Sequence, residues 1–245
     1  RIPLAGQVIA KPRWQNHAID MVQVRAVFNE EEISFLLEWD DPFKDTTHDV
    51  TREIHEFENT YVMAVDEIPR ERDVFRDSVA LQFPVKLKSG AKKPHFFRGD
   101  TSNPVNLWVW KSDLDDAGSN PVVDSNANGF KKPLKAQPEA GQQVQGKGVW
   151  KNGRWRVVMK RSLQTGERGD IQFKKGEMIP MAFNAWDGSN GEHGMIMSLS
   201  AWSFLYLDVP AADSLYWYAL LVVAVIAGLL LLFMRYSRSR SEKDT

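Results

Sequence analysis

Short segments in which apolar and polar residues alternate recur along the first 210 residues, and this pattern predicts β-strands. Met21–Phe28 alternates, a polar turn follows, and Ile33–Trp39 resumes the pattern, as is typical of a hairpin. In Val105–Trp110, alternate residues belong to opposite faces, so Leu107 and Trp108 should point to different sides. The remaining expected strands are Val79–Pro84, Trp155–Lys160, Ile179–Trp186 and Ser198–Leu207.

The segments between these strands read as turns and loops. Asn152-Gly153 favours a type I′ turn, which predicts a hairpin around it. Asp45–Tyr61 is polar, contains His48 and His55, and reads as a loop with one helical turn at most. Lys111–Gly148 has little apolar pattern, so we expect a long surface loop that a partner subunit orders. The chain shows no helical period before residue 215, and the pattern predicts an all-β, antiparallel β-sandwich.

A different pattern follows near the C-terminus, where Leu215–Met234 contains no charged residue. Twenty helical residues reach about 30 Å, the thickness of the hydrocarbon core of a bilayer, so this run predicts a single transmembrane helix. Four basic residues follow it, and the positive-inside rule places that tail in the cytoplasm. We therefore expect an extracytoplasmic, periplasmic domain over 1–210, a helix over 211–234 in the cytoplasmic (inner) membrane, and a basic cytoplasmic tail over 235–245. Because the chain begins at Arg1 and not at Met, we expect that an export signal has been removed.

Composition excludes several classes of function. The formal net charge is −1, and no basic stripe points to nucleic acid. The chain contains no cysteine, which excludes disulfides, iron–sulfur clusters and covalently attached c-type haem. Asp40, Asp41 and Asp187 resemble catalytic acids, but they stand beside Pro or Gly, so turn formation explains them. With no nucleophile constellation, metal-ligand cluster or phosphate loop, we expect no active site and therefore no enzyme.

An ordered set of segments resembles the haem b-binding γ subunit of ethylbenzene dehydrogenase and its relatives, which include dimethylsulfide dehydrogenase and nitrite oxidoreductase. The segments are EISFLLEWDDP, DSVALQFP, FFRGD with VNLWVWK, NGRWRVVMKRSL, and IPMAFNAWDGSNGEHG with SLSAW. The resemblance implies a β-sandwich that holds one non-covalent haem b through a Met and a Lys. It also implies partners, namely iron–sulfur, molybdenum or cytochrome subunits of a respiratory complex, and a soluble cytochrome c. The C-terminal anchor departs from most of these γ subunits.

Neither ligand of that family is present by type. Arg98 stands at the position of the Met, and a guanidinium does not ligate iron in the ordinary way. Met197 stands at the position of the Lys, and its thioether is an ordinary axial ligand. His95 is the nearest nitrogen donor on the first segment, and His193 is a second candidate. We expect Trp108 to line the haem pocket and Arg98 to pair with a haem propionate.

Two further interpretations stay open. In one, the haem site is lost, Met197 fills the core, and the chain is a structural or assembly subunit of such a complex. In the other, the sandwich is a carbohydrate-binding module whose exposed Trp and acidic residues bind sugar. The leading interpretation is a membrane-anchored electron-transfer subunit with haem b on the outer side of the membrane.

Overall fold

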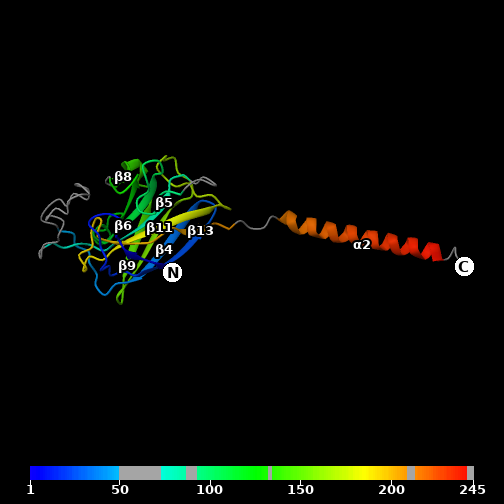
Figure 1. The fold of residues 1–245 in the computed structure, drawn as a ribbon, viewed down its shortest axis with the longest axis horizontal. Helices are drawn as coiled ribbons and strands as arrows, with labels where there is room; N and C mark the ends of the chain where they lie inside the picture. Colours follow the sequence, from blue (N-terminus) through cyan, green and yellow to red (C-terminus); the bar gives the residue numbers. More distant parts are fainter. Residues whose placement is uncertain (50–72, 87–92, 132–133, 209–212, 242–245) are drawn as a thin grey trace. The chain divides into compact units, whose positions relative to one another are not determined.

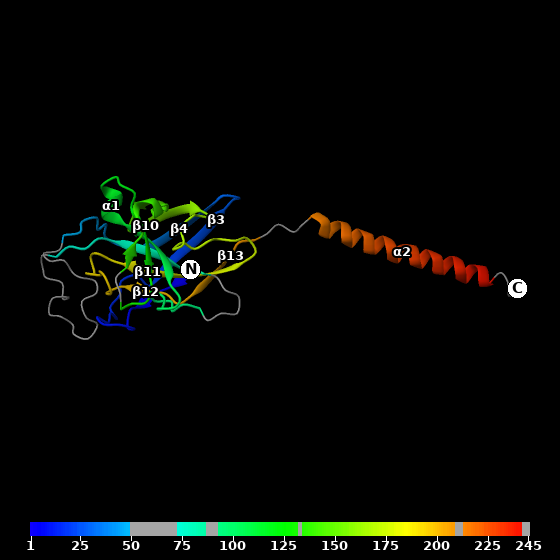
Figure 2. The ribbon, with the colours of Figure 1, turned by 90° about the horizontal axis from the view of Figure 1, so that it is seen from above.

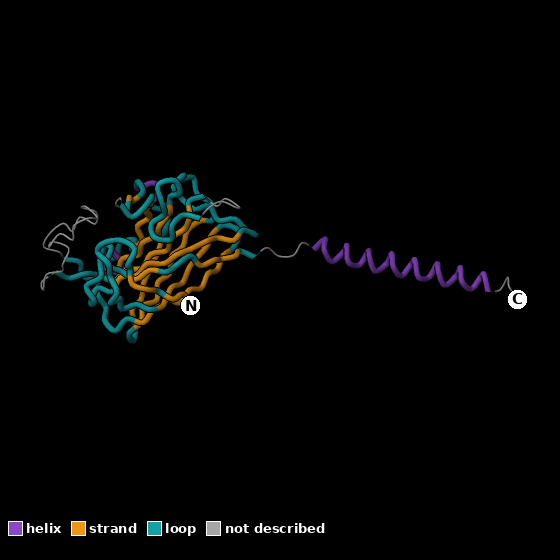
Figure 3. The backbone as a smooth tube through the Cα atoms, in the orientation of Figure 1, coloured by secondary structure: helices purple, strands orange, loops and turns teal. Residues whose placement is uncertain are grey.

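The computed structural model describes residues 1–49, 73–86, 93–131, 134–208 and 213–241. It divides into two compact units, Arg1–Leu207 and Asp208–Thr245. In Figure 3 the strands gather in the first unit, and the second contains a long helix. The strands are β1 (Ile2–Pro3), β2 (Ala5–Gly6), β3 (Met21–Phe28), β4 (Glu32–Asp40), β5 (Ser78–Pro84), β6 (Val105–Lys111), β7 (Val122–Ala127), β8 (Lys135–Ala136), β9 (Gln145–Trp150), β10 (Arg154–Ser162), β11 (Met178–Trp186), β12 (Ser198–Leu199) and β13 (Ser203–Tyr206). The helices are α1 (Ser112–Asp116), a 3-10 turn (Glu139–Gly141) and α2 (Asp213–Ser241).

The strands form two antiparallel sheets (Figure 1), which confirms the all-β prediction. The first sheet has the order β1-β3-β4-β10-β9, and β3, β4 and β10 lie side by side in Figure 2. The second has the order β2-β12-β11-β5-β6-β7-β8, and β13 pairs with β11. The β3–β4 hairpin is present as predicted, and Asn152 and Gly153 adopt the positive φ values of 56° and 70° that a type I′ turn requires.

The main core lies between the sheets. It contains Phe35, Leu37 and Trp39 of β4, and Trp108 and Trp110 of β6. Phe35 contacts Trp108 edge-on, with ring centroids 5.8 Å apart. Burying each such side chain contributes about 1.5–3 kcal/mol of unfolding free energy, so these aromatic residues hold the two sheets together.

A second apolar cluster covers the outer face of the second sheet. It contains Ala80 of β5 and Leu107 and Val109 of β6, whose sequence neighbours face the main core. Phe97 and Met197 come from connecting segments and complete it. The alternation along β5 and β6 therefore separates a sandwich core from an outer cluster, and the outer cluster contains the candidate ligand Met197.

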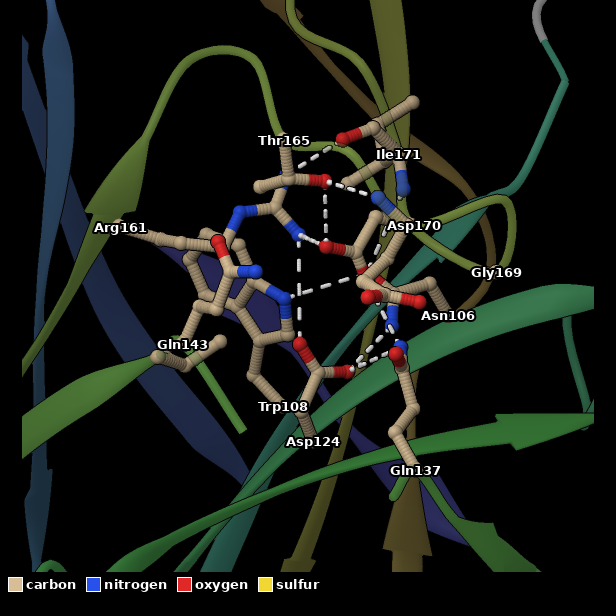
Figure 4. A network of polar contacts seen from close by, with 12 residues as sticks. Asn106, Trp108, Asp124, Gln137, Gln143, Arg161, Thr165, Gly169, Asp170 and Ile171 are labelled. Atoms are coloured by element: carbon tan, nitrogen blue, oxygen red, sulfur yellow. Dashed lines mark hydrogen bonds and ion pairs between the residues drawn. The ribbon is translucent and has the colours of Figure 1, made fainter. Parts of the chain in front are cut away.

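The predicted surface loop over Lys111–Gly148 is wrong in part. This stretch contains α1, β7, β8 and most of β9, and β7 pairs with β6 along its whole length. Its buried Asp124 accepts from Asn106 of β6 at 2.5 Å and from Gln137 at 3.1 Å, and the half-buried Gln137 also donates to Asp170 at 2.6 Å. Figure 4 shows that Arg161 of β10 points into this network. Hydrogen-bonded polar side chains here occupy strand positions that apolar residues usually occupy. The sequence therefore lacks the apolar alternation that would have predicted β7.

Two other expectations need correction or fall outside the described residues. Ser198–Leu207 is not one strand, because β12 pairs with β11 and β2, while β13 pairs with β11 further along. Most of Asp45–Tyr61, with His55, lies outside the described residues. Among the residues that the structure describes, no helix reaches the length and hydropathy of a membrane span.

Candidate functional site

The segment His95–Asp100 lies over the outer apolar cluster and is held there by Gln82 of β5. The Gln82 side chain donates to the carbonyl of Phe96 at 2.7 Å and accepts from the backbone N–H of Arg98 at 3.0 Å. Arg98 and Gly99 have positive φ values of 58° and 71°, so the chain turns sharply here. A Cβ at Gly99 would lie 2.7 Å from the carbonyl oxygen of Asn103, so this turn needs glycine.

The segment Met195–Met197 reaches the same place from the other end of the chain and is held by Gln7. The backbone N–H of Gln7 donates to the carbonyl of Met197 at 3.0 Å, and the Gln7 side chain donates to the carbonyl of Met195 at 3.1 Å. Gln7 and Gln82 are each fully buried. Sequence reasoning missed both residues, because a single glutamine carries no signal that it positions a loop.

Arg98 joins the two segments. Its Nη2 donates to the carbonyl of Gly194 at 3.3 Å, and the residue is only 1% exposed. Phe97 and Met197 are both fully buried in the outer apolar cluster. The structure thus brings Arg98 and Met197, which were predicted from distant parts of the sequence, to one face of one sheet.

The two candidate histidines differ in position and tautomer. His95 is exposed, and its Nδ1 accepts from the backbone N–H of Phe97 at 3.1 Å, so in the neutral ring the proton is on Nε2. His193 is buried, and its Nδ1 donates to the carbonyl of Gly191 at 2.8 Å. The His193 ring stacks on Phe75 at a centroid distance of 4.2 Å. Of the two, His193 has the tautomer that metal-binding histidines usually have.

Trp108 does not join this group. It faces the main core, where it contacts Phe35, Phe83 and Phe173, and its Nε1 donates to Asn106 at 3.2 Å. The alternation of β6 puts Leu107 and Val109 on the face toward Met197 instead. The expectation that Trp108 walls the haem is therefore wrong, since the sheet separates it from the other candidates.

The comparisons with known proteins fix the family. The sequence profile of the ethylbenzene dehydrogenase family matches residues 1–138 and 133–198. The chain belongs to this family. Its relatives include a protein of Haloferax mediterranei provisionally named a respiratory nitrate reductase heme subunit, ORF7, which is 25% identical over 82% of this chain and 61% of its own length. The gamma subunit of chlorate reductase from Ideonella dechloratans is 30% identical over 51% of this chain and 47% of its own length. The chain thus spans about half to three-fifths of these relatives.

Solved structures with a similar arrangement of strands include a family 9 carbohydrate-binding module from Caldicellulosiruptor kristjanssonii. In complex with glucose it has a TM-score of 0.40 and 8% identity, and the match covers 86% of each chain. In complex with cellotriose it has a TM-score of 0.38 at the same identity, over 86% of this chain and 85% of the other.

The residues at the junction fit a haem that has one axial ligand from the family positions, and they do not reproduce the Met–Lys pair that the family resemblance implies. Met197 supplies a thioether within the outer apolar cluster on the second sheet. Apolar surroundings of this kind suit a porphyrin ring. Arg98 supplies a buried guanidinium, which suits a propionate and cannot ligate iron. For a second ligand, the sequence offers His95 and His193 as nitrogen donors near these two segments.

Proposed function

We propose that this chain is a non-catalytic, electron-transfer subunit of a respiratory oxidoreductase complex and holds one non-covalent haem b. The haem lies between the His95–Asp100 segment and the Met195–Met197 segment. The observation that carries the proposal is the junction at which Arg98 donates to the carbonyl of Gly194 beside the buried Met197. The names of the two relatives, a heme subunit and a reductase gamma subunit, support the same kind of role.

Each residue of the junction has a distinct task in this proposal. When bound, the haem supplies a one-electron couple whose potential its axial ligands and surroundings set. Met197 ligates the iron, and its thioether favours the reduced form compared with two nitrogen ligands. Arg98 neutralises a propionate, while Phe97 and Leu107 exclude water. His95 and His193 are the two candidates for a second ligand: Nδ1 of His95 accepts from the backbone N–H of Phe97, and Nδ1 of His193 donates to the carbonyl of Gly191.

The partners and the location extend this proposal. Iron–sulfur, molybdenum or cytochrome subunits would exchange electrons with the haem, and a soluble cytochrome c would accept them on the outer side. The segment Leu215–Met234 of α2 anchors the chain in the bilayer as a single pass, with 1–210 outside and 235–245 in the cytoplasm. Its uncharged sequence supports this, as do the basic residues that follow it.

A haem-free scaffold or assembly subunit is the second candidate function. It is favoured by Arg98, which stands at the position of a family ligand and fills the junction with a buried charge. A carbohydrate-binding module is disfavoured, because that interpretation relied on exposed Trp side chains. None of the eight described Trp side chains in residues 1–207 is exposed.

The absorption spectrum of the purified full chain separates these candidates, and a pair of methionine variants tests the ligand. Met197 and Met159 are both fully buried, Met197 in the outer cluster and Met159 in the main core. Met197→Ala and Met159→Ala should each lower the free energy of unfolding by about 2–5 kcal/mol. Only Met197→Ala should shift the Soret band and lower the reduction potential.

Two results would contradict the proposal. An unchanged spectrum and potential in the Met197→Ala variant would remove Met197 as a ligand. A native protein with no reduced α band, purified from cells that supply haem, would establish the scaffold function instead.

A further inference from the structure

Three buried carboxylates meet at one end of the sandwich, outside the proposed haem junction. Asp41 directly follows β4, Asp77 directly precedes β5, and Asp187 directly follows β11. They are 0%, 0% and 4% exposed, and one oxygen of each lies within 4.8 Å of the others. Asp45 approaches the same group, since a Cβ at Gly188 would lie 2.8 Å from the Cβ of Asp45. The cluster therefore joins β4 of the first sheet to β5 and β11 of the second.

Nothing among the described residues neutralises this charge. None of the ion pairs formed by the described part of the chain includes Asp41, Asp45, Asp77 or Asp187. The buried carboxylates of Asp41, Asp77 and Asp187 therefore have no ionic partner within the described part of the chain.

Two oxygens in the cluster are buried without a hydrogen-bond partner. They are Oδ2 of Asp41 and Oδ2 of Asp45. The neighbouring buried Glu192 shows the contrast, because its carboxylate accepts from Trp14, Ala18, Asn190 and the backbone N–H of Asp187. An unsatisfied carboxylate oxygen in the interior is costly unless a proton or a cation occupies the space beside it. These oxygens, together with the missing counter-charge, point to a bound cation.

We propose that Asp41, Asp77 and Asp187 bind a calcium ion, with Asp45 beside the site. The donor set consists of hard carboxylate oxygens, which suit Ca²⁺ or Mg²⁺ and not Zn²⁺, since Zn²⁺ in proteins usually takes His or Cys ligands. Ca²⁺ lies about 2.3–2.6 Å from its ligands, so oxygens on opposite sides of one ion are about 4.6–5.2 Å apart. The corresponding separation for Mg²⁺ is about 4.0–4.2 Å, with stricter octahedral geometry and several retained waters. Oxygens that lie within 4.8 Å of one another are compatible with either ion, and Ca²⁺ is preferred because it accepts irregular oxygen geometry with fewer retained waters.

The ion would fix the loop that leads to the haem junction. Asp187 begins this loop, and its Oδ1 accepts from the hydroxyl of Ser189 at 2.6 Å and the backbone N–H of Asn190 at 3.0 Å. The loop ends at Gly194, whose carbonyl accepts a hydrogen bond from Nη2 of Arg98. Calcium thus clamps the two sheets and holds one end of the Gly188–Gly194 loop.

The test uses the full chain, stripped with a chelator at pH 7.5 and titrated with CaCl₂ alone. Calorimetry should give one Ca²⁺ per chain, and Tm should rise by about 5 °C or more at a hundredfold excess over Kd. Asp41→Asn removes one charge and a ligand without changing the shape. Its Tm without metal should be equal to or above that of the native chain, because repulsion is relieved, and its response to Ca²⁺ should be lost.

The control is Asp40→Asn at the neighbouring position, where the side chain is 81% exposed and pairs with Arg154. This variant should keep the full calcium response. A native chain whose Tm does not change with Ca²⁺, or an Asp41→Asn variant that still binds it, would overturn the proposal. An equal response to MgCl₂ would overturn the assignment to calcium. The haem spectrum is read separately, so failure here leaves the proposed function standing.

Discussion

Arg161 is the charge on which the buried polar network depends, and removing it should destabilise the first unit severely. Its side chain is fully buried, and its Nη1 lies 3.1 Å from Oδ2 of Asp170 and 4.0 Å from Oδ2 of Asp124. Its Nη2 donates to the carbonyl of Ile171, and the guanidinium lies 5.0 Å from the centre of the Trp108 ring. Arg161→Leu would leave two buried carboxylates facing each other and one carbonyl without its donor (Figure 4).

The size of the effect follows from these contacts. Removing one partner of a buried ion pair costs about 3–5 kcal/mol, because the remaining charge is uncompensated. For a unit of this size each kcal/mol moves Tm by about 2–4 °C, so Arg161→Leu should lower Tm by about 6–20 °C at pH 7.5. Thermal unfolding followed by circular dichroism measures this. The triple variant Arg161→Leu, Asp124→Asn, Asp170→Asn should recover most of the loss, because neutral amides replace the unpaired charges.

The pH dependence of the Arg161→Leu variant gives a second measurement. Burial, together with the nearby Asp170, raises the pKa of Asp124 to about 7, although Arg161 acts to lower it. Without Arg161 the folded-state pKa rises again, above the ordinary unfolded value. The folded variant then takes up a proton more readily than the unfolded chain, so its deficit should shrink as the pH falls from 8 to 5. A deficit below about 1 kcal/mol at pH 7.5 would refute the reasoning, and so would one that is equal at both pH values.

Two further outcomes are expected from the acidic cluster and the C-terminal helix. In the chelator-treated chain, stability should fall as the pH rises from about 4 through 8, because the pKa values of Asp41 and Asp77 are about 8 and 7 in the folded state and lower when unfolded. Thermal scans at pH 6 and 8.5 check this; CaCl₂ should flatten the dependence, and a Tm that rises with pH would contradict it. In sealed cells, protease added outside should digest residues 1–210 and leave the tail 235–245 intact. Cleavage of the tail alone would reverse the proposed orientation.

The strands were predictable where neighbouring residues point into different surroundings. Met21–Phe28 became β3, and Val105–Trp110 became β6, whose alternate residues enter the main core and the outer cluster. The β7 strand was missed because its polar residues have partners elsewhere in the chain: the buried Asp124 accepts from Asn106, and the half-buried Asn126 donates to the carbonyl of Gly169. When a strand is stabilised by polar contacts with residues distant in the sequence, its own residues show no apolar alternation.

The candidate site was predictable only where the family resemblance fixed a position. It placed Arg98 and Met197 on two distant segments, and the fold brings these together through Gln82 and Gln7. Alternation along β6 already put Leu107 and Trp108 on opposite faces, but no local feature said which face lies toward Met197. Trp108 was chosen wrongly for that reason.

The acidic cluster shows how one residue can have a local and a distant role at once. The turn interpretation of Asp41 and Asp187 is correct: Oδ1 of Asp41 accepts from the backbone N–H of Phe43 at 3.1 Å, and Asp187 accepts from Asn190. Those turns use one oxygen of each carboxylate and bury the residue. Only the pairing of β5 with β11, together with the packing of the two sheets, brings Asp77 beside them. Turn formation explains why Asp41 and Asp187 stand at these positions in the sequence. The same turns also hold the two carboxylates in place for a cation.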